Sequence, residues 1–173
     1  LPGQSDGGLY IIRDPHLPHT QPIRITSSKK GWFYHRATYI KLPGGKEGII
    51  TARAKKTIFG NGEGELVWLS IPSAITNSDI IHDEPWQEVV LAKGPDVMFE
   101  VLDIDKNDDS VEIVSAHFFG SKLSVSSLSA TSTFPFVEIS HTYSLDIVGR
   151  PYGLCVASMT PPDSERERDL EHT

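Results

Sequence analysis

The chain has 173 residues, of which 38% are hydrophobic, and a formal net charge of -7 at pH 7. This length suffices for one domain with its own core, and no apolar run approaches the roughly 18 residues that a membrane-spanning helix needs. The acidic balance argues against nucleic acid as a partner, because binding phosphates requires clustered Lys and Arg. The single cysteine, Cys155, excludes an internal disulfide framework, and its apolar surroundings predict a buried thiol.

Short β-strands are predicted along almost the whole chain, and helix signals are nearly absent. The 14 glycines and 12 prolines punctuate the apolar segments, as turn residues do. In chain order, the predicted strands span residues 9–13, 22–26, 32–42, 48–55, 65–71, 86–91, 97–103, 111–118, 122–127 and 136–141. A further strand is expected within residues 149–158. The Ser/Thr-rich stretch up to residue 133 is expected to become a flexible loop, and the acidic tail 161–173 to be disordered.

The four strands between residues 32 and 91 recur in the same order between residues 97 and 141. The sequences correspond as well, since residues 50–53 (ITAR) match residues 114–117 (VSAH). A unit of four strands over about sixty residues is typical of a β-propeller blade. We therefore predict an all-β fold, a partial β-propeller of four-stranded antiparallel blades, with Ile50 and Val114 at equivalent positions in neighbouring sheets. A β-sandwich is the alternative fold.

The predicted propeller occupies residues 1–160, with whole blades at about 31–94 and 95–148 and partial blades at both ends. Closed propellers need at least about four blades, and an open stack leaves strand edges and apolar faces uncovered. We therefore expect the chain to need flanking blades or to self-associate. The first six residues carry turn chemistry instead of a signal-peptide pattern, which we interpret as a processed product or a fragment.

An acidic turn follows the first strand of the second predicted blade. Asp103, Asp105 and Asn107 alternate along it, and Asp109 adds a fourth oxygen ligand. Ca²⁺ is bound by such sets of oxygen ligands in tight turns, so the sequence predicts a Ca²⁺ site here. The alternative is a solvated acidic turn that is held by hydrogen bonds from Asp and Asn side chains to the backbone.

The framework around this turn, residues 101–105 (VLDID) before it and 112–116 (EIVSA) after it, resembles the FG-GAP or VCBS type of propeller repeat. Such repeats occur in integrin α-subunit heads and in many secreted proteins. Two residues depart from the family pattern: Asp108 stands where the family has glycine, and Glu112 lies one position late for the closing ligand. The resemblance implies a secreted or extracellular binding or interaction module with a protein or carbohydrate ligand, in which Ca²⁺ stiffens one turn.

Polar side chains on the first and second strands are the candidate site residues. Tyr34, His35 and Arg36 lie on a first strand, which lines the central channel of a propeller, and Arg53 and His117 occupy matching positions on the two second strands. Such a channel binds carboxylates or sugars, and it offers a general base near neutral pH. The alternative function is therefore a propeller-type carbohydrate lyase or dehydratase that uses Tyr34, His35, Arg36 and His117. A structural role, with these residues facing solvent or pairing between blades, also stays open.

Overall fold

The computed structural model describes residues 6–55, 62–72, 85–96, 98–104 and 109–155. Within these residues the fold is all-β, as predicted, with three antiparallel sheets and one short 3-10 turn, η1 (Pro43–Gly45). The strands are β1 (Tyr10–Ile11), β2 (Ile23–Arg24), β3 (Trp32–Lys41), β4 (Glu47–Lys55), β5 (Glu63–Ser70), β6 (Gln87–Lys93), β7 (Met98–Leu102), β8 (Ser110–His117), β9 (Lys122–Ala130) and β10 (Val137–Asp146). No helix in this part of the chain is long and apolar enough to cross a membrane.

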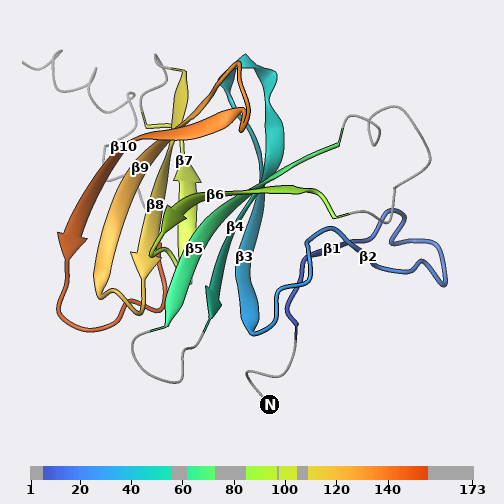
Figure 1. The fold of residues 1–173 in the computed structure, drawn as a ribbon, viewed down its shortest axis with the longest axis horizontal. Coiled ribbons are helices and arrows are strands. Elements are labelled where there is room, and N and C mark those ends of the chain that lie inside the picture. Colours follow the sequence, from blue (N-terminus) through green and yellow to red (C-terminus); the bar gives the residue numbers. More distant parts are fainter. Residues whose placement is uncertain (1–5, 56–61, 73–84, 97, 105–108, 156–173) are drawn as a thin grey trace, which may run out of the picture.

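Two of the sheets are four-stranded meanders, in which each strand pairs with the next one along the chain (Figure 1). We call β3–β6 the middle sheet and β7–β10 the last sheet. The strands β1 and β2 form a separate two-stranded sheet, the N-terminal hairpin. Each predicted set of four strands thus forms one antiparallel sheet, and none of the three sheets closes on itself within the described residues.

The middle sheet is buried on both faces. In β4, Ile50 and Ala52 point to one face and Thr51 and Arg53 to the other, because successive side chains alternate along a strand. All four residues are at most 1% exposed. A strand that is buried on both sides requires a layer against each face of its sheet.

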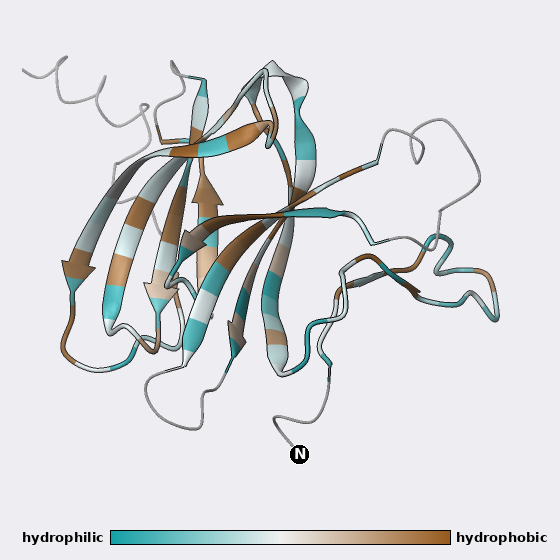
Figure 2. Cartoon of the chain, in the orientation of Figure 1, coloured by the Kyte–Doolittle hydropathy of each residue, from teal (hydrophilic) through white to brown (hydrophobic). Residues whose placement is uncertain are grey.

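The last sheet covers one face of the middle sheet and the N-terminal hairpin covers the other. The centre of the main core is formed by Ile50 and Trp68 of the middle sheet with Phe99 and Ile113 of the last sheet. A smaller core joins Ile25, after β2, to Leu69 and Trp86. Figure 2 shows hydrophobic residues along β4, β5 and β6, where the layers meet. Each fully buried large side chain contributes about 1.5–3 kcal/mol to folding.

The two large sheets are stacked in the same orientation. The strand β3 lies against β7 and β6 lies against β10, so the strand order of one sheet follows that of the other. Ile50 and Val114 lie on the second strands of separate sheets, as predicted. Ile50 faces the last sheet, whereas Val114 points away from the main core, because its neighbour Ile113 points into it.

The outer face of the last sheet, which we call the open face, carries an apolar patch beside Glu100 and Glu112. Cross-strand pairing brings its residues into two rows, Val114–Val125–Tyr143 and Ala116–Leu123–Leu145. Tyr143 is 66% exposed and Leu145 is 65% exposed. Within the described residues, no further sheet covers this face.

Three further sequence predictions are wrong. The Ser/Thr-rich stretch forms the second half of β9, which continues to Ala130, because its alternate residues Ser126 and Leu128 are buried against the core. Residues 149–155 contain no strand, and Cys155 is exposed instead of buried. Without a pairing partner, an isolated apolar segment has no ladder of hydrogen bonds to hold it as a strand. The tail 161–173 lies outside the described residues.

Candidate functional site

The polar residues predicted on β3 do not converge on one point. Tyr34 accepts a hydrogen bond from Arg53, while His35 is exposed at a bulge in the pairing of β3 with β4. Arg36 points to the last sheet, where its Nη2 lies 2.9 Å from Glu100 Oε2 on β7. Within the described residues, the three side chains thus serve three separate environments.

Arg53 is the centre of a buried ion-pair network on the hairpin side of the middle sheet. Its side chain is 1% exposed, its Nε donates to Glu65 Oε2 at 2.8 Å, and its Nη1 donates to Glu88 Oε2 at 2.7 Å. The guanidinium also lies 5.0 Å from the centre of the Trp32 ring, a favourable cation–π distance. Burial alone would lower the pKa of Arg53, but the hydrogen bonds to Glu65, Glu88 and Tyr34 keep it raised.

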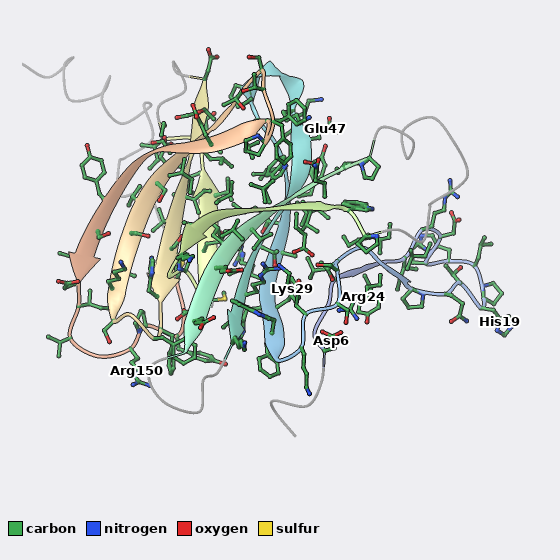
Figure 3. All side chains as sticks on the ribbon, in the orientation of Figure 1. Asp6, His19, Arg24, Lys29, Glu47 and Arg150 are labelled. Atoms are coloured by element: carbon green, nitrogen blue, oxygen red, sulfur yellow. The ribbon has the colours of Figure 1, made fainter. Side chains whose placement is uncertain are left out.

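Glu88 extends this network to the N-terminal hairpin. It accepts hydrogen bonds from both the backbone N–H and the hydroxyl of Ser27, at 2.9 and 2.8 Å. Lys29 Nζ lies 3.4 Å from the same carboxylate, in the region where the hairpin meets the middle sheet (Figure 3). Burial alone would raise the pKa of Glu88, but the hydrogen bonds from Arg53 and Ser27 hold it below its usual value. Each guanidinium nitrogen of Arg53 therefore donates to Glu65, Glu88 or Tyr34 in a structural contact.

His117 occupies the position on β8 that Arg53 occupies on β4, and it too faces the preceding sheet. The side chain is only 3% exposed. Its Nε2 lies 2.7 Å from Ser124 Oγ, whereas its Nδ1 lies beside the Gly94 backbone without a well-formed hydrogen bond. Burial, and after it the charge of Lys122, lowers the pKa of His117 to about 4. The imidazole is therefore neutral at physiological pH.

A hollow of about 300 Å³ lies beside His117, between the middle and last sheets. We call it the inner hollow. Its lining consists of Gly62, Gly64, Gly94, Gly120, His117, Phe119 and Lys122. The glycines keep it open: a Cβ at Gly94 would lie 2.8 Å from His117 Nδ1, and a Cβ at Gly62 would lie 2.6 Å from the Phe119 ring.

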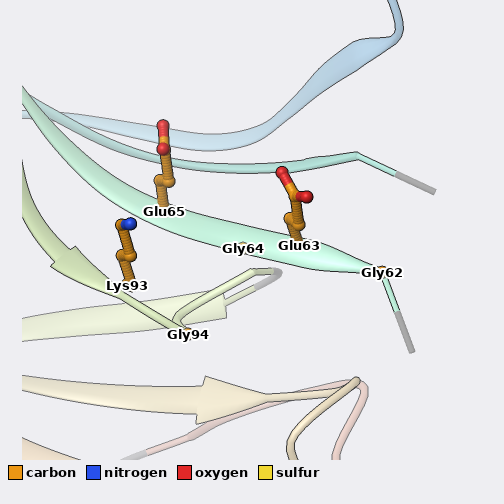
Figure 4. Close-up of a pocket in the computed structure, with 6 residues that line it drawn as sticks. All are labelled: Gly62, Glu63, Gly64, Glu65, Lys93 and Gly94. Carbon is orange, nitrogen blue, oxygen red and sulfur yellow. The ribbon is translucent and has the colours of Figure 1, made fainter. Parts of the chain in front are cut away.

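A second hollow of about 420 Å³ lies along three of the same glycines, Gly62 just before β5, Gly64 in β5 and Gly94 just after β6 (Figure 4). Glu63, Glu65 and Lys93 provide its charged side chains. Since Glu63 and Glu65 alternate with Gly64 along β5, these carboxylates point to the face opposite the one that Gly64 presents. This second hollow, which we call the outer hollow, is therefore lined by both acidic and basic side chains. One of them, Glu65, is already paired with Arg53.

Asp96 holds the wall of the inner hollow in place. This residue is fully buried in the β6–β7 link, and its two carboxylate oxygens accept the backbone N–H groups of Phe118 and Phe119 at 2.7 Å each. Burial raises the pKa of Asp96 against the opposing effect of these hydrogen bonds. The turn that carries Phe119 is thus fastened to the link between the sheets.

The predicted Ca²⁺ turn is described only at its two ends. Asp103 and Asp109 are exposed, whereas Asp105 and Asn107 lie outside the described residues. Glu112 Oε2 accepts the N–H of Ile104 at 2.9 Å and so braces the start of the turn. Within the described residues, no group of three or more His, Cys, Asp or Glu side chains is arranged to hold a metal.

Sequence reasoning found Arg53 and His117 but missed their partners. Glu65 is the cross-strand partner of Arg53, and Lys122 is the partner of His117, so counting outward from the two hairpin turns identifies both pairs. No sequence signal distinguishes Asp96 or Gly94 from ordinary turn residues.

Comparison with known proteins finds no matching family model, no matching curated protein and no matching solved structure.

Proposed function

We propose that this chain is an interaction module built from propeller-type blades, and that its open face docks a further four-stranded sheet. The observation that carries the proposal is the open face itself. It uses the same strand positions by which the middle sheet packs on the last sheet, with Val114 where the middle sheet has Ile50.

We expect the sheet that docks on the open face to present an apolar surface like the one that the last sheet presents to the middle sheet. In the interface between the middle and last sheets, Ile50 and Trp68 pack in one core with Phe99 and Ile113. The open face continues this stack in the same direction, and its exposed Tyr143 and Leu145 would be buried by one more layer. Repeat proteins bury their faces by such neighbour-to-neighbour stacking.

The resemblance of the acidic-turn framework to FG-GAP or VCBS repeats supports the finer parts of the proposal. They are a propeller architecture, a secreted or extracellular location, a protein or carbohydrate ligand, and Ca²⁺ at the acidic turn. A lyase or dehydratase is less well supported, because Tyr34, His35 and Arg36 have separate surroundings and Tyr34 is engaged by Arg53.

The test is self-association of the chain, in which a second copy of the last sheet occupies the open face. Analytical ultracentrifugation over a wide range of concentrations should detect association, and Leu145→Lys should weaken it by placing a charge in the interface. Ile12→Lys is the matched control, since Ile12 is 52% exposed next to β1 at the opposite end of the stack. A monomer at every concentration, or equal effects of the two variants, would overturn the docking proposal.

A further inference from the structure

The gap between the middle and last sheets differs from the gap between the hairpin and the middle sheet. In the hairpin gap, Arg53 is satisfied by Glu65, Glu88 and Tyr34, and its network fills the space. In the second gap, the matching position holds His117, which is only 3% exposed and whose Nδ1 lies beside the Gly94 backbone without a well-formed hydrogen bond. A buried polar atom without a partner is costly unless a ligand or water satisfies it.

The inner hollow gives access to this atom. Gly94 has a φ of +113°, a conformation that glycine adopts without strain, and any side chain there would press on His117 Nδ1. Gly62 and Gly64 leave the opposite wall bare, since a Cβ at either would meet Phe119 or Asp96. The volume of about 300 Å³ is at the small end of the range for ligand pockets.

The groups that line the inner hollow define the chemistry of its ligand. Ser124 can donate its hydroxyl proton to Nε2 of His117, which leaves the proton of the neutral imidazole on Nδ1 as a donor. Lys122 supplies one positive charge, and within the described residues no ion pair occupies it. Phe119 supplies an aromatic surface. One donor, one cation and one ring match a single anionic group on an apolar or planar body.

We infer that the inner hollow binds a small monocarboxylate, with its carboxylate between His117 Nδ1 and Lys122 and its body against Phe119. A carboxylate is a planar acceptor that takes one charge-assisted hydrogen bond from a lysine and a second bond from a neutral N–H. A dianion is disfavoured, because Lys122 is the single cationic side chain among the described lining residues. This site is independent of the open face and of the docking proposal.

The experiment is a titration of the full ¹⁵N-labelled chain followed by amide NMR spectra. The probes are benzoate, its neutral counterpart benzamide, and inorganic phosphate. Benzoate should shift the amides of Gly62, Gly94 and Gly120 with saturation at a dissociation constant on the order of 1 mM, as expected for a ligand of this size. Benzamide and phosphate should cause no saturating shift at these glycines.

The variant Lys122→Met should weaken benzoate binding about tenfold, which corresponds to losing one charge-assisted contact. Lys41→Met is the control, because Lys41 lies at the far end of β3 and pairs with Glu47. Dispersed spectra of both variants verify that they fold. Binding of benzamide or phosphate as tight as that of benzoate, no saturable shift with benzoate, or equal losses in both variants would each overturn the carboxylate site.

Discussion

His117 and Arg53 illustrate how matching positions carry different chemistry. Both lie on the second strand of a sheet and both face the layer before it. Arg53 is charged and meets two carboxylates, whereas His117 is neutral and meets one hydroxyl. Both side chains are buried, so the difference lies in their partners: a buried charge requires a partner of opposite charge, whereas a buried imidazole can remain neutral.

The neutral state of His117 makes folding stability depend on pH. The pKa of about 4 in the native state lies below the value of 6.5 for an unperturbed histidine. The unfolded chain therefore takes up the proton first, and stability that is full above pH 6.5 is lost as the pH falls to about 4. The total loss is on the order of 3 kcal/mol.

The measurement is denaturant unfolding of wild type and His117→Gln between these two pH values. The variant should have a shallower pH dependence, while Asp96 and Glu88 titrate in both proteins and cancel in the difference. His16→Gln, in the exposed loop between β1 and β2, is the control. Equal slopes for wild type and His117→Gln would show that His117 does not titrate with a lowered pKa.

Gly48 on β4 is required by the close approach of the Trp68 ring. Trp68 is completely buried, and a Cβ at Gly48 would collide with its six-membered ring. Gly48→Ala should therefore reduce the free energy of unfolding by about 1–3 kcal/mol through overpacking. Gly153→Ala is the matched control, since no atom lies within 4 Å of its Cβ position. Chemical denaturation checks both, and equal stabilities would contradict the packing argument.

At the scale of elements, side chains fasten the layers to one another. The Arg53 network joins β4, β5 and β6 and reaches the hairpin through Glu88 and Ser27. Arg36 of β3 joins the last sheet through Glu100 of β7, and Asp96 fastens the β8–β9 turn to the β6–β7 link. These contacts fix how each sheet sits on the next, which apolar packing alone specifies less well.

Arg53→Met should destabilise the fold by about 3 kcal/mol, because it removes the cation from the largely buried Glu65 and leaves Glu88 with only the more exposed Lys29. Arg36→Met should cost less than about 1 kcal/mol, since both partners of that pair are roughly 30% exposed and screened by solvent. Unfolding in urea compares the two variants. A smaller cost for Arg53→Met than for Arg36→Met would contradict the assignment of the network as the main polar fastening.

The β7–β8 turn carries the calcium prediction. If Asp103, Asp105 and Asn107 hold Ca²⁺, millimolar CaCl₂ should raise the melting temperature, because a ligand that binds only the native state stabilises it. The double variant Asp103→Ala/Asp105→Ala should lose this response, and Asp14→Ala, in an exposed turn, should keep it. An unchanged melting temperature of wild type would leave the turn as a structural one braced by Glu112.

At the scale of the molecule, three layers are stacked in chain order, and among the described residues only the middle sheet is covered on both faces. Its central strands should therefore be the most protected part of the fold. Amide hydrogen exchange should be slowest in β4 and β5 and faster in β10, which is an edge strand of the last sheet. Protection in β10 equal to that in β4 would mean that the open face is covered.

The strand pattern and the two-sheet division were predictable from the sequence, and the contents of the site were not. Alternating apolar residues and glycine-rich turns locate the strands within a few residues, since both signals are local. The exception is the end of β9, where a Ser/Thr-rich stretch predicted a loop beyond residue 127, although Leu128 is buried in the main core and the strand continues to Ala130. Cys155 shows the opposite error, because an apolar neighbourhood in sequence does not guarantee a neighbour in space.

By itself, the sequence determined an all-β chain, two units of four antiparallel strands, and the correspondence of Arg53 with His117. These features follow from period-two alternation and from turns, which act over a few residues. The tertiary structure alone decided that Arg53 is paired with Glu65, Glu88 and Tyr34. It also decided that His117 is neutral and has no well-formed hydrogen bond at Nδ1, and that glycines leave a hollow beside it. Such features depend on which layers meet and how much water they exclude, and these are properties of residues far apart in the chain.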